Sequence, residues 1–393
     1  MRVYLDNSAT TKVDARVVEA MLPYFTDTFG NPSSLHGFGR GALKGVDAAR
    51  DYIAAYFNCR PSEIYFTSGA TESNNWVLRG IVGASNNKIK HIVTTNIEHP
   101  AILDTCRDLE REGVLVSYIK CNNEGVVSVE DVKNAVTDNT ILVSVMAANN
   151  ETGAIQPIKE IGAFCKAEGI PFHSDAVQAI EALDFDVNEL NLDMLSLSGH
   201  KFHAPKGIGL LYLRSGVKLK KLITGGHQER NQRAGTTNAA FIVALAKGLE
   251  IAKEEREATN ARLTVLRDYF IKRALAEIPY CYLNGGITHR LPNNVNLSFG
   301  FIEGESILML LDIKGIAVSS GSACSSGSLE PSHVILALGV KEELAHSSVR
   351  FSLGKDTTKE ELDYTLEALK ESVARLREIS PLFNVQTGTG SYV

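Results

Sequence analysis

Lys201 lies in a setting that suits chemistry better than solvent exposure. It falls within Ser196-Leu-Ser-Gly-His-Lys-Phe-His-Ala-Pro-Lys-Gly-Ile-Gly209, between small polar residues and a proline–glycine turn. A solvated lysine needs no such setting. A lysine that attacks a carbonyl needs desolvation and nearby positive charge, because both lower the pKa of an amine and expose its nucleophilic form. The stretch therefore predicts a lysine that forms a Schiff base.

A possible anion site precedes this lysine in the chain. The stretch Thr67-Ser-Gly-Ala-Thr-Glu-Ser-Asn-Asn75 follows a predicted strand and opens a predicted helix. Backbone N–H groups at a helix start, the positive end of the helix dipole and the hydroxyls of Ser68 and Thr71 can together bind a phosphate. The alternative is a well-capped helix that binds nothing.

Three further polar residues stand where predicted strands end. Asp175 closes "PFHSD", with Gln178 three residues later, and a carboxylate there can keep a pyridine nitrogen protonated. His99 in "NIEHPAIL" can stack on a flat ring, and Asn150 in "AANNETG" can bond a ring oxygen. Taken singly, the alternatives are a buried capping Asp, a capping His and an Asn in a turn.

Two groups next to Lys201 add to the same site. Ser198 and His200 bring hydrogen-bonding side chains to the same anion or ring. A structural metal site on His200 and His203 remains an alternative, although no cysteine or carboxylate accompanies them in sequence. A phosphate site, a stacking ring, a strand-end carboxylate and a sheltered lysine in one domain predict pyridoxal 5'-phosphate as the cofactor.

The elements that must position these groups alternate between strand and helix. A helix is expected at Pro157–Glu168, with a proline at its start and Gly169 just past its end. This rhythm predicts an α/β fold with a mostly parallel, seven-stranded sheet covered by helices on both faces, and ligands beyond the carboxyl ends of the strands. Strands are expected at 63–67, 90–95, 114–119, 141–146, 171–175, 194–198 and 208–213.

The pattern changes after Thr237. Long amphipathic helices are expected over 239–277, followed by strands at 294–299 and 347–353 and a last helix at 357–379. We predict a large cofactor-binding domain at 15–259 and a smaller α+β domain formed by 1–14 and 260–393. The final stretch, "SPLFNVQTGTGSYV", has no period and is expected to be loose.

Composition excludes several classes of function. The 393 residues carry a formal charge of -6, so a broad basic surface for nucleic acid is not expected. No apolar run approaches the roughly 18 to 20 residues that span a bilayer, which predicts a cytoplasmic protein without membrane contact. Six scattered cysteines without a Cys-x-x-Cys pair argue against disulfides and zinc knuckles.

With these residues in place, the chain resembles the cysteine desulfurases of the NifS/IscS type, which are fold type I pyridoxal phosphate enzymes of the class V aminotransferase family. The resemblance runs from Tyr4 to about Leu382. It includes "YLDNSATT", "FGNPSSLH", "TSGATESNN", "NNETG", "SGHK", "RAGTTN", "SSGSACSSGSLEPS" and "LAHSSVRFSLG". The chain departs from the family at His203-Ala204, often Tyr-Gly, and at Thr237, often acidic, which concerns packing near the cofactor.

The resemblance implies a role for each matching residue. Lys201 forms the Schiff base, Asp175 pairs with the pyridine nitrogen, and His99 stacks on the ring and shuttles a thiol proton. Arg350 binds the substrate carboxylate, a task suited to its planar two-pronged donor. The other implied cofactor contacts are Asn150 (also near the substrate) and Gln178 at the ring substituents, Ala70, Thr71, Ser198 and His200 around the phosphate and ring, and Thr236 at the phosphate of a neighbouring subunit.

Cys324 matches the family's reactive cysteine. The resemblance implies that L-cysteine becomes L-alanine, with its sulfur carried as a persulfide on Cys324 to acceptors for iron–sulfur cluster assembly. The implied partners are a second copy of the chain and an iron–sulfur scaffold protein of the IscU or NifU type. No intrinsic metal is expected, although Cys324 could share an iron–sulfur ligand role with the scaffold. A glycine–serine segment around it suits a thiol that must travel.

Two rival functions stay open from the sequence. A selenocysteine lyase or class V aminotransferase would share the cofactor residues without needing a mobile cysteine, and alanine release against keto-acid consumption separates these enzymes. A non-enzymatic sulfur carrier or assembly protein would use Cys324 alone, and purified protein without pyridoxal phosphate would favour it.

Overall fold

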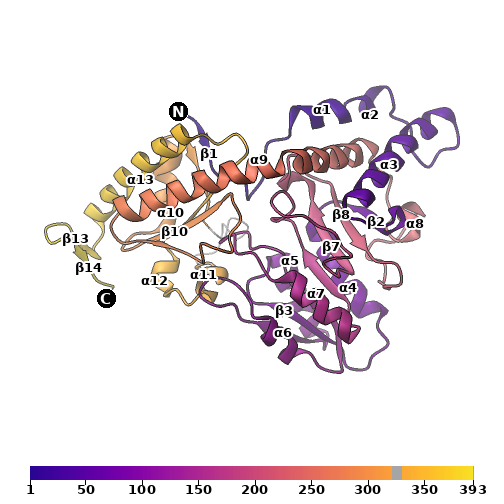
Figure 1. Ribbon diagram of the computed structural model, residues 1–393, viewed down its shortest axis with the longest axis horizontal. Coiled ribbons are helices and arrows are strands. Elements are labelled where there is room, and N and C mark those ends of the chain that lie inside the picture. Colours follow the sequence, from indigo (N-terminus) through magenta and orange to yellow (C-terminus); the bar gives the residue numbers. More distant parts are fainter. Residues whose placement is uncertain (321–329, 393) are drawn as a thin grey trace.

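The computed structural model describes residues 1–320 and 330–392. The chain forms a large α/β part and a smaller α+β part, and the long helix α9 (Ala239–Glu277) runs along both (Figure 1). Both chain ends lie on the smaller part.

The large part is built on one seven-stranded sheet. Its order is β2-β8-β7-β6-β5-β3-β4. Neighbouring strands from β7 to β4 run parallel, whereas β8 is antiparallel to both β7 and β2, which confirms the mostly parallel sheet. The strands are β2 (Ile64–Thr67), β3 (His91–Thr95), β4 (Leu115–Ile119), β5 (Thr140–Ser144), β6 (Phe172–Asp175), β7 (Met194–Ser198) and β8 (Gly209–Leu213).

Helices cover both faces of this sheet. On one face, side chains of α3 (Gly37–Tyr56), α7 (Ile158–Glu168) and the first half of α9 join one apolar core. On the other, α4 (Ala70–Ala84) and α5 (Pro100–Arg111) form a second core around Trp76. Strand residues alternate between the two cores, as Leu210 and Leu211 do, because successive side chains of a strand point to opposite faces. The remaining helices of this part are α1 (Ala15–Met21), α2 (Pro23–Thr26), α6 (Val129–Ala135) and α8 (Gln228–Asn231).

The smaller part has its own core. A three-stranded antiparallel sheet, ordered β12-β10-β9, packs with α10 (Gly304–Ile313) and α13 (Lys359–Ile379). The N-terminal strand β1 (Val3–Tyr4) belongs here, pairing in parallel with β11 (Ile316–Ala317). The other elements are β9 (Cys281–Leu283), β10 (Asn294–Phe299), β12 (Ser348–Ser352), α11 (His333–Ala337) and α12 (Glu342–Ala345).

Helix α9 takes part in both cores. Its residues from Ile242 to Ala252 pack in the large part, and those from Leu263 to Ala274 pack in the small one. Where the sequence predicts helices over 239–277, the structure has one continuous helix of 39 residues. The division into domains at 259/260 remains a prediction.

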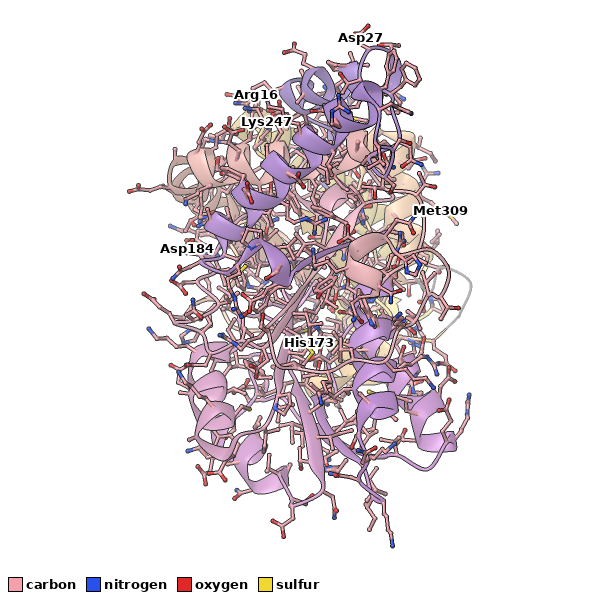
Figure 2. All side chains as sticks on the ribbon, turned by 90° about the vertical axis from the view of Figure 1, so that its right-hand side faces the viewer. Arg16, Asp27, His173, Asp184, Lys247 and Met309 are labelled. Carbon is pink, nitrogen blue, oxygen red and sulfur yellow. The ribbon has the colours of Figure 1, made fainter. Side chains whose placement is uncertain are left out.

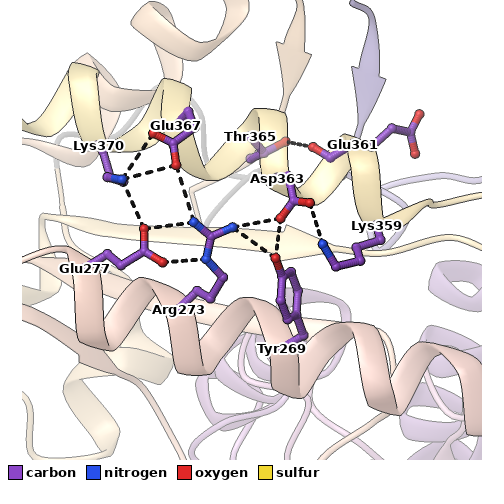
Figure 3. Close-up of polar contacts among 9 residues, drawn as sticks. All are labelled: Tyr269, Arg273, Glu277, Lys359, Glu361, Asp363, Thr365, Glu367 and Lys370. Atoms are coloured by element: carbon purple, nitrogen blue, oxygen red, sulfur yellow. Dashed lines mark hydrogen bonds and ion pairs between the residues drawn. The ribbon is translucent and has the colours of Figure 1, made fainter.

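A charged network joins α9 to α13 at the outer surface (Figure 3). Arg273 on α9 contacts Glu277 at 2.5 Å and reaches Asp363 on α13 at 2.8 Å. Lys370 contacts the same Glu277 at 3.0 Å. Exposed pairs of this kind contribute about 0–1 kcal/mol each, so the apolar core between the helices is the stronger link.

One buried histidine, His173, is structural. It lies on β6 in the middle of the molecule (Figure 2), between the hydroxyls of Ser144 at 2.8 Å and Ser196 at 2.9 Å. Burial lowers the pKa of this imidazole to about 3, so the ring stays neutral and bridges three neighbouring strands.

The sequence prediction of a loose C-terminal tail is wrong. Strands β13 (Phe383–Asn384) and β14 (Thr389–Gly390) form a small hairpin. The ring of Tyr392 stacks on Phe301 with centroids 4.8 Å apart, and the tyrosine hydroxyl accepts the Phe301 N–H at 2.8 Å. Two-residue strands are too short to leave a period in the sequence, and a long-range aromatic contact holds them.

No helix in the described ranges is long and apolar enough to cross a membrane.

Candidate active site

A cavity of about 530 Å³ opens at the carboxyl ends of the central strands. Residues that follow β2, β3, β5, β6 and β7 meet there with residues of the N-terminal segment and of the smaller part. Ten of the predicted site residues line it, namely Ala70, Thr71, His99, Asn150, Asp175, Gln178, Ser198, His200, Lys201 and Arg350. Long-range packing therefore brings together what the sequence spreads over 281 positions, from 70 to 350 inclusive.

The start of helix α4 forms the anion-binding end of the cavity. Gly69 is its N-cap, and no side chain of the described residues caps the helix, so its first-turn N–H groups remain for a ligand. Gly209 on β8 allows a close approach here, since a Cβ would lie 2.6 Å from the Gly69 Cα. Glu72 accepts the Ser68 N–H at 2.8 Å, and Arg233 offsets its charge at 2.8 Å.

Asp175 is fixed as an acceptor at the end of β6. It is 6% exposed. The Asn74 amide donates to one carboxylate oxygen at 2.7 Å, and the Val177 N–H donates to the other at 3.0 Å. The two donors fix the orientation of the carboxylate, the kind of group that can hold a proton on a pyridine nitrogen.

The Lys201 amine lies against the N-terminal segment. Its Nζ donates to the Ser8 carbonyl at 2.5 Å and to the Ala9 carbonyl at 2.9 Å. The Gln178 amide donates to the same Ser8 carbonyl at 3.1 Å. The lysine is thus inside the cavity and near Asp175 and the start of α4, as the sequence predicts, and does not point into bulk water.

The histidines on either side of Lys201 hold this segment in place. His200 lies 3.2 Å from the Thr10 hydroxyl, and the His203 ring donates to the Lys12 carbonyl at 2.8 Å. Burial lowers the pKa of His200 to about 4. The two rings therefore serve hydrogen bonds to the N-terminal segment, and the described residues contain no cluster of three or more metal ligands.

His99 is the N-cap of α5 and borders the cavity. Its Nδ1 accepts the Ala101 N–H at 3.0 Å. Burial is the main cause that lowers its pKa, opposed by the charge of Asp175. Because an acceptor nitrogen carries no proton, the neutral ring has its proton on Nε2.

Arg350 comes from β12 in the smaller part and is 2% exposed. Its guanidinium donates to the Asn150 carbonyl at 2.9 Å and to the Asp6 carboxylate at 3.0 Å. The Nε atom is buried without a partner in the described ranges. A buried guanidinium with an unused donor at the cavity edge suits a carboxylate ligand.

Several lining residues were missed by the sequence reasoning. Ser8 and Ala9 contact the lysine, although the only signal was their place in the "YLDNSATT" motif. Asn74 supports Asp175 from within "TSGATESNN". Glu151 and His333 also line the cavity. Thr236 is exposed and lies outside this cavity, and Cys324 lies outside the described residues.

This set of groups fits pyridoxal phosphate. An uncapped helix start for a phosphate, a buried carboxylate for a ring nitrogen, and an amine for an aldehyde lie around one cavity. The cavity volume lies within the range usual for small-ligand sites.

Comparison with known proteins identifies the family. The model of the class-V aminotransferases matches residues 3–365. The chain belongs to this family. Members of the family depend on pyridoxal phosphate, so the predicted cofactor is confirmed.

Similar proteins carry the same name as the group recognised in the sequence. The class-V chain is 52% identical to a cysteine desulfurase IscS of Clostridium botulinum, over 97% of both chains. A solved "NifS-like protein" superposes with a TM-score of 0.90 at 39% identity, over 96% of this chain and 100% of the other. "SspA in complex with cysteine" superposes at 0.80 with 37% identity, over 89% and 98%. Both the recognition and the fold class are confirmed.

Proposed function

We propose that this class-V protein is a cysteine desulfurase that converts L-cysteine to L-alanine and passes the sulfur on through Cys324. The observation that carries the proposal is the meeting of Lys201, Asp175 and Arg350 at one cavity, from three separate regions of the chain. It is supported by the relatives named cysteine desulfurase and by the solved neighbour in complex with cysteine.

When bound, pyridoxal phosphate supplies an electron sink for a bond broken at the substrate Cα. The site residues remain proposals. Lys201 holds the cofactor through its amine, and Asp175 keeps the ring-nitrogen proton in place with Asn74 behind it. The backbone at Ala70 and Thr71, with Ser198 and His200, would hold the phosphate, and Asn150 and Gln178 would bind the ring substituents. All six residues line the cavity.

Arg350 orients the substrate. A carboxylate can take the place of the Asp6 contact or use the unpartnered Nε of the guanidinium. The Lys201 amine would then face the substrate Cα and move its proton. The Ser8 and Ala9 carbonyls hold the lysine ammonium while it carries that proton.

Cys324 is the proposed sulfur acceptor. The five described cysteines are poor candidates because burial raises the pKa of each thiol, to about 12 for Cys59, Cys106, Cys165 and Cys281. A thiolate is the nucleophilic form of cysteine, and these side chains hold their protons. The Cys324 thiolate would attack the substrate sulfur as the Cβ–S bond breaks, with the electron pair of that bond passing to the substrate carbon. The carbon takes up a proton to give alanine, and a persulfide remains on Cys324.

Two variants test this function. Lys201→Ala removes the amine that binds the aldehyde, so the protein should lose its cofactor absorbance band and all turnover. Cys324→Ser should keep the band and stop forming alanine from cysteine. Cys59→Ser is the matched control, because its thiol is half-buried away from the cavity, and it should keep activity. Unchanged alanine formation in Cys324→Ser would remove the persulfide step, and keto-acid consumption instead of alanine release would indicate an aminotransferase.

A homodimer is the proposed assembly. Large apolar side chains lie exposed on the segment from α1 to α3, at Leu22, Phe25, Phe29, Leu35 and Phe38. Asp27 marks this segment at the outer end of the molecule (Figure 2). Patches of this kind favour a protein interface, and an exposed Thr236 is available to a second copy. Sedimentation should give a dimer of 42.7 kDa chains.

The proposed acceptor of sulfur rests on the proposed role of Cys324. We propose a scaffold protein of the IscU or NifU type as the acceptor of sulfur from Cys324, in a cytoplasmic setting. Transfer of radiolabelled sulfur from cysteine to candidate scaffolds, with and without Cys324, tests the acceptor.

A further inference from the structure

A third histidine, His333, lines the cavity together with His99 and His200. It is the first residue of the short helix α11. Its Nε2 lies 3.1 Å from the backbone carbonyl of Glu98. A carbonyl can only accept a hydrogen bond, so this nitrogen carries a proton.

The other ring nitrogen of His333 is Nδ1. It forms no hydrogen bond with the described residues, and it is not among their buried atoms that lack a partner. In a neutral ring with its proton on Nε2, Nδ1 is an acceptor. His333 thus offers a proton acceptor to the cavity that its ring lines.

His99 has the opposite arrangement. Its Nδ1 is used by the Ala101 N–H, which leaves the proton of the neutral ring on Nε2. Protonating His99 would require Nδ1 to give up the cap of helix α5. Of the two rings, His333 is therefore the better placed to accept a proton.

The position of His333 is fixed from both sides. The neighbouring Ser332 donates to the buried Glu151 carboxylate at 2.5 Å and accepts the Val334 N–H at 3.1 Å. Val334 packs in a small core with Ile97 and Met146. Arg350 donates to the carbonyl of Asn150, the residue before Glu151, so His333 and the guanidinium are anchored at the same turn of the cavity wall.

We propose that His333 is an acid–base residue of this site, which takes the thiol proton of the cysteine substrate on Nδ1. The S–H bond breaks and an N–H bond forms on Nδ1 while the Cys324 thiolate bonds to the substrate sulfur and the Cβ–S bond breaks, its electron pair passing to the substrate carbon. The imidazolium then releases its proton to water through the cavity. The inference rests on the proposed function.

The test compares His333→Gln with His289→Gln in the full-length protein loaded with pyridoxal phosphate. Glutamine can keep the bond to the Glu98 carbonyl but cannot take the proton. The kcat for alanine formation from L-cysteine should fall about 10²-fold, the low end of what a positioned base contributes, with the cofactor absorbance band unchanged. His289 is exposed and outside the cavity, so its variant should match the unaltered protein.

A second variant separates proton transfer from structure. Added imidazole should restore turnover in His333→Ala, because a free base can enter the space, whereas a purely structural defect would not respond. Turnover of His333→Gln within about twofold of the control, or no rescue by imidazole, would overturn the inference. Failure of the unaltered protein to form alanine would instead contradict the proposed function.

Discussion

The two ends of the cavity are built differently. At the phosphate end, the start of α4 and Lys201 follow strands of one sheet and Asp175 ends a third strand. Asp175 already accepts two hydrogen bonds. At the substrate end, Arg350 comes from the smaller part and contacts Asp6 and the Asn150 carbonyl. One end is thus organised by a single sheet, while the other exists only when three distant segments meet.

The largest effect expected is at the phosphate end, from Asp175→Asn. Asparagine retains the shape but removes the charge that holds a proton on the ring nitrogen. Loss of a preorganised electrostatic partner typically lowers kcat about 10²–10³-fold, and the cofactor should stay bound through Lys201. Steady-state kinetics and the absorbance band check this. The exposed Asp104→Asn on α5 is the control, and equal turnover in both would show that the carboxylate is not needed.

A smaller effect is expected at the substrate end, from Arg350→Lys. Lysine keeps the charge but loses the two-pronged geometry, so KM for L-cysteine should rise at least about tenfold, in line with the loss of a charged hydrogen bond worth about 1.5–3 kcal/mol. The cofactor band should not change, since Arg350 is outside the phosphate end. Arg375→Lys, on the exposed side of α13, should leave KM as it was. A changed band in Arg350→Lys would mean that the two ends are not separable.

The smallest effect concerns Glu98, which lies fully buried before His99. Burial raises its pKa to about 8, and its one bonded oxygen accepts from Thr95 and Met146. A carboxyl with a raised folded-state pKa stabilises the protein fully below the unfolded pKa, near 4.3, and that stability is lost as pH rises through 8.

Glu98→Gln should therefore flatten the pH dependence of thermal stability. Between pH 5 and 8 the unaltered protein should lose about 2 °C or more in Tm relative to the variant. Scanning calorimetry at both pH values checks this, with Glu130→Gln on the exposed side of α6 as the control. A parallel fall in Glu98→Gln would show that Glu98 is charged in the fold.

The phosphate end was predictable because its groups follow local patterns. Strand ends, a glycine before a helix and a closing carboxylate are visible within a few residues, so Thr71, Asp175 and Lys201 could be chosen before the structure. The confirmed sheet needed no more than the alternation of strand and helix. The resemblance then placed Arg350, which local pattern alone does not single out.

The rest depends on contacts far apart in sequence. The Ser8 and Ala9 carbonyls reach Lys201 across more than 190 positions, and no pattern in "LDNSATT" predicts a bond from a backbone carbonyl. His333 is recognisable only once its Nε2 is seen on the Glu98 carbonyl. The terminal hairpin was missed for the same reason, since Tyr392 needs Phe301 to hold it.

Helix α9 connects the large part, which carries Lys201, to the smaller part, which carries Arg350. A helix of 39 residues is about 58 Å long, and it is anchored in one core before Ala252 and in the other after Leu263. Adding one residue between these anchors would rotate the second half by about 100° and shift it by about 1.5 Å. Such a change would carry the smaller part, and with it the guanidinium, away from the amine. The number of residues in this span of α9 therefore fixes how the smaller part is placed relative to the large part.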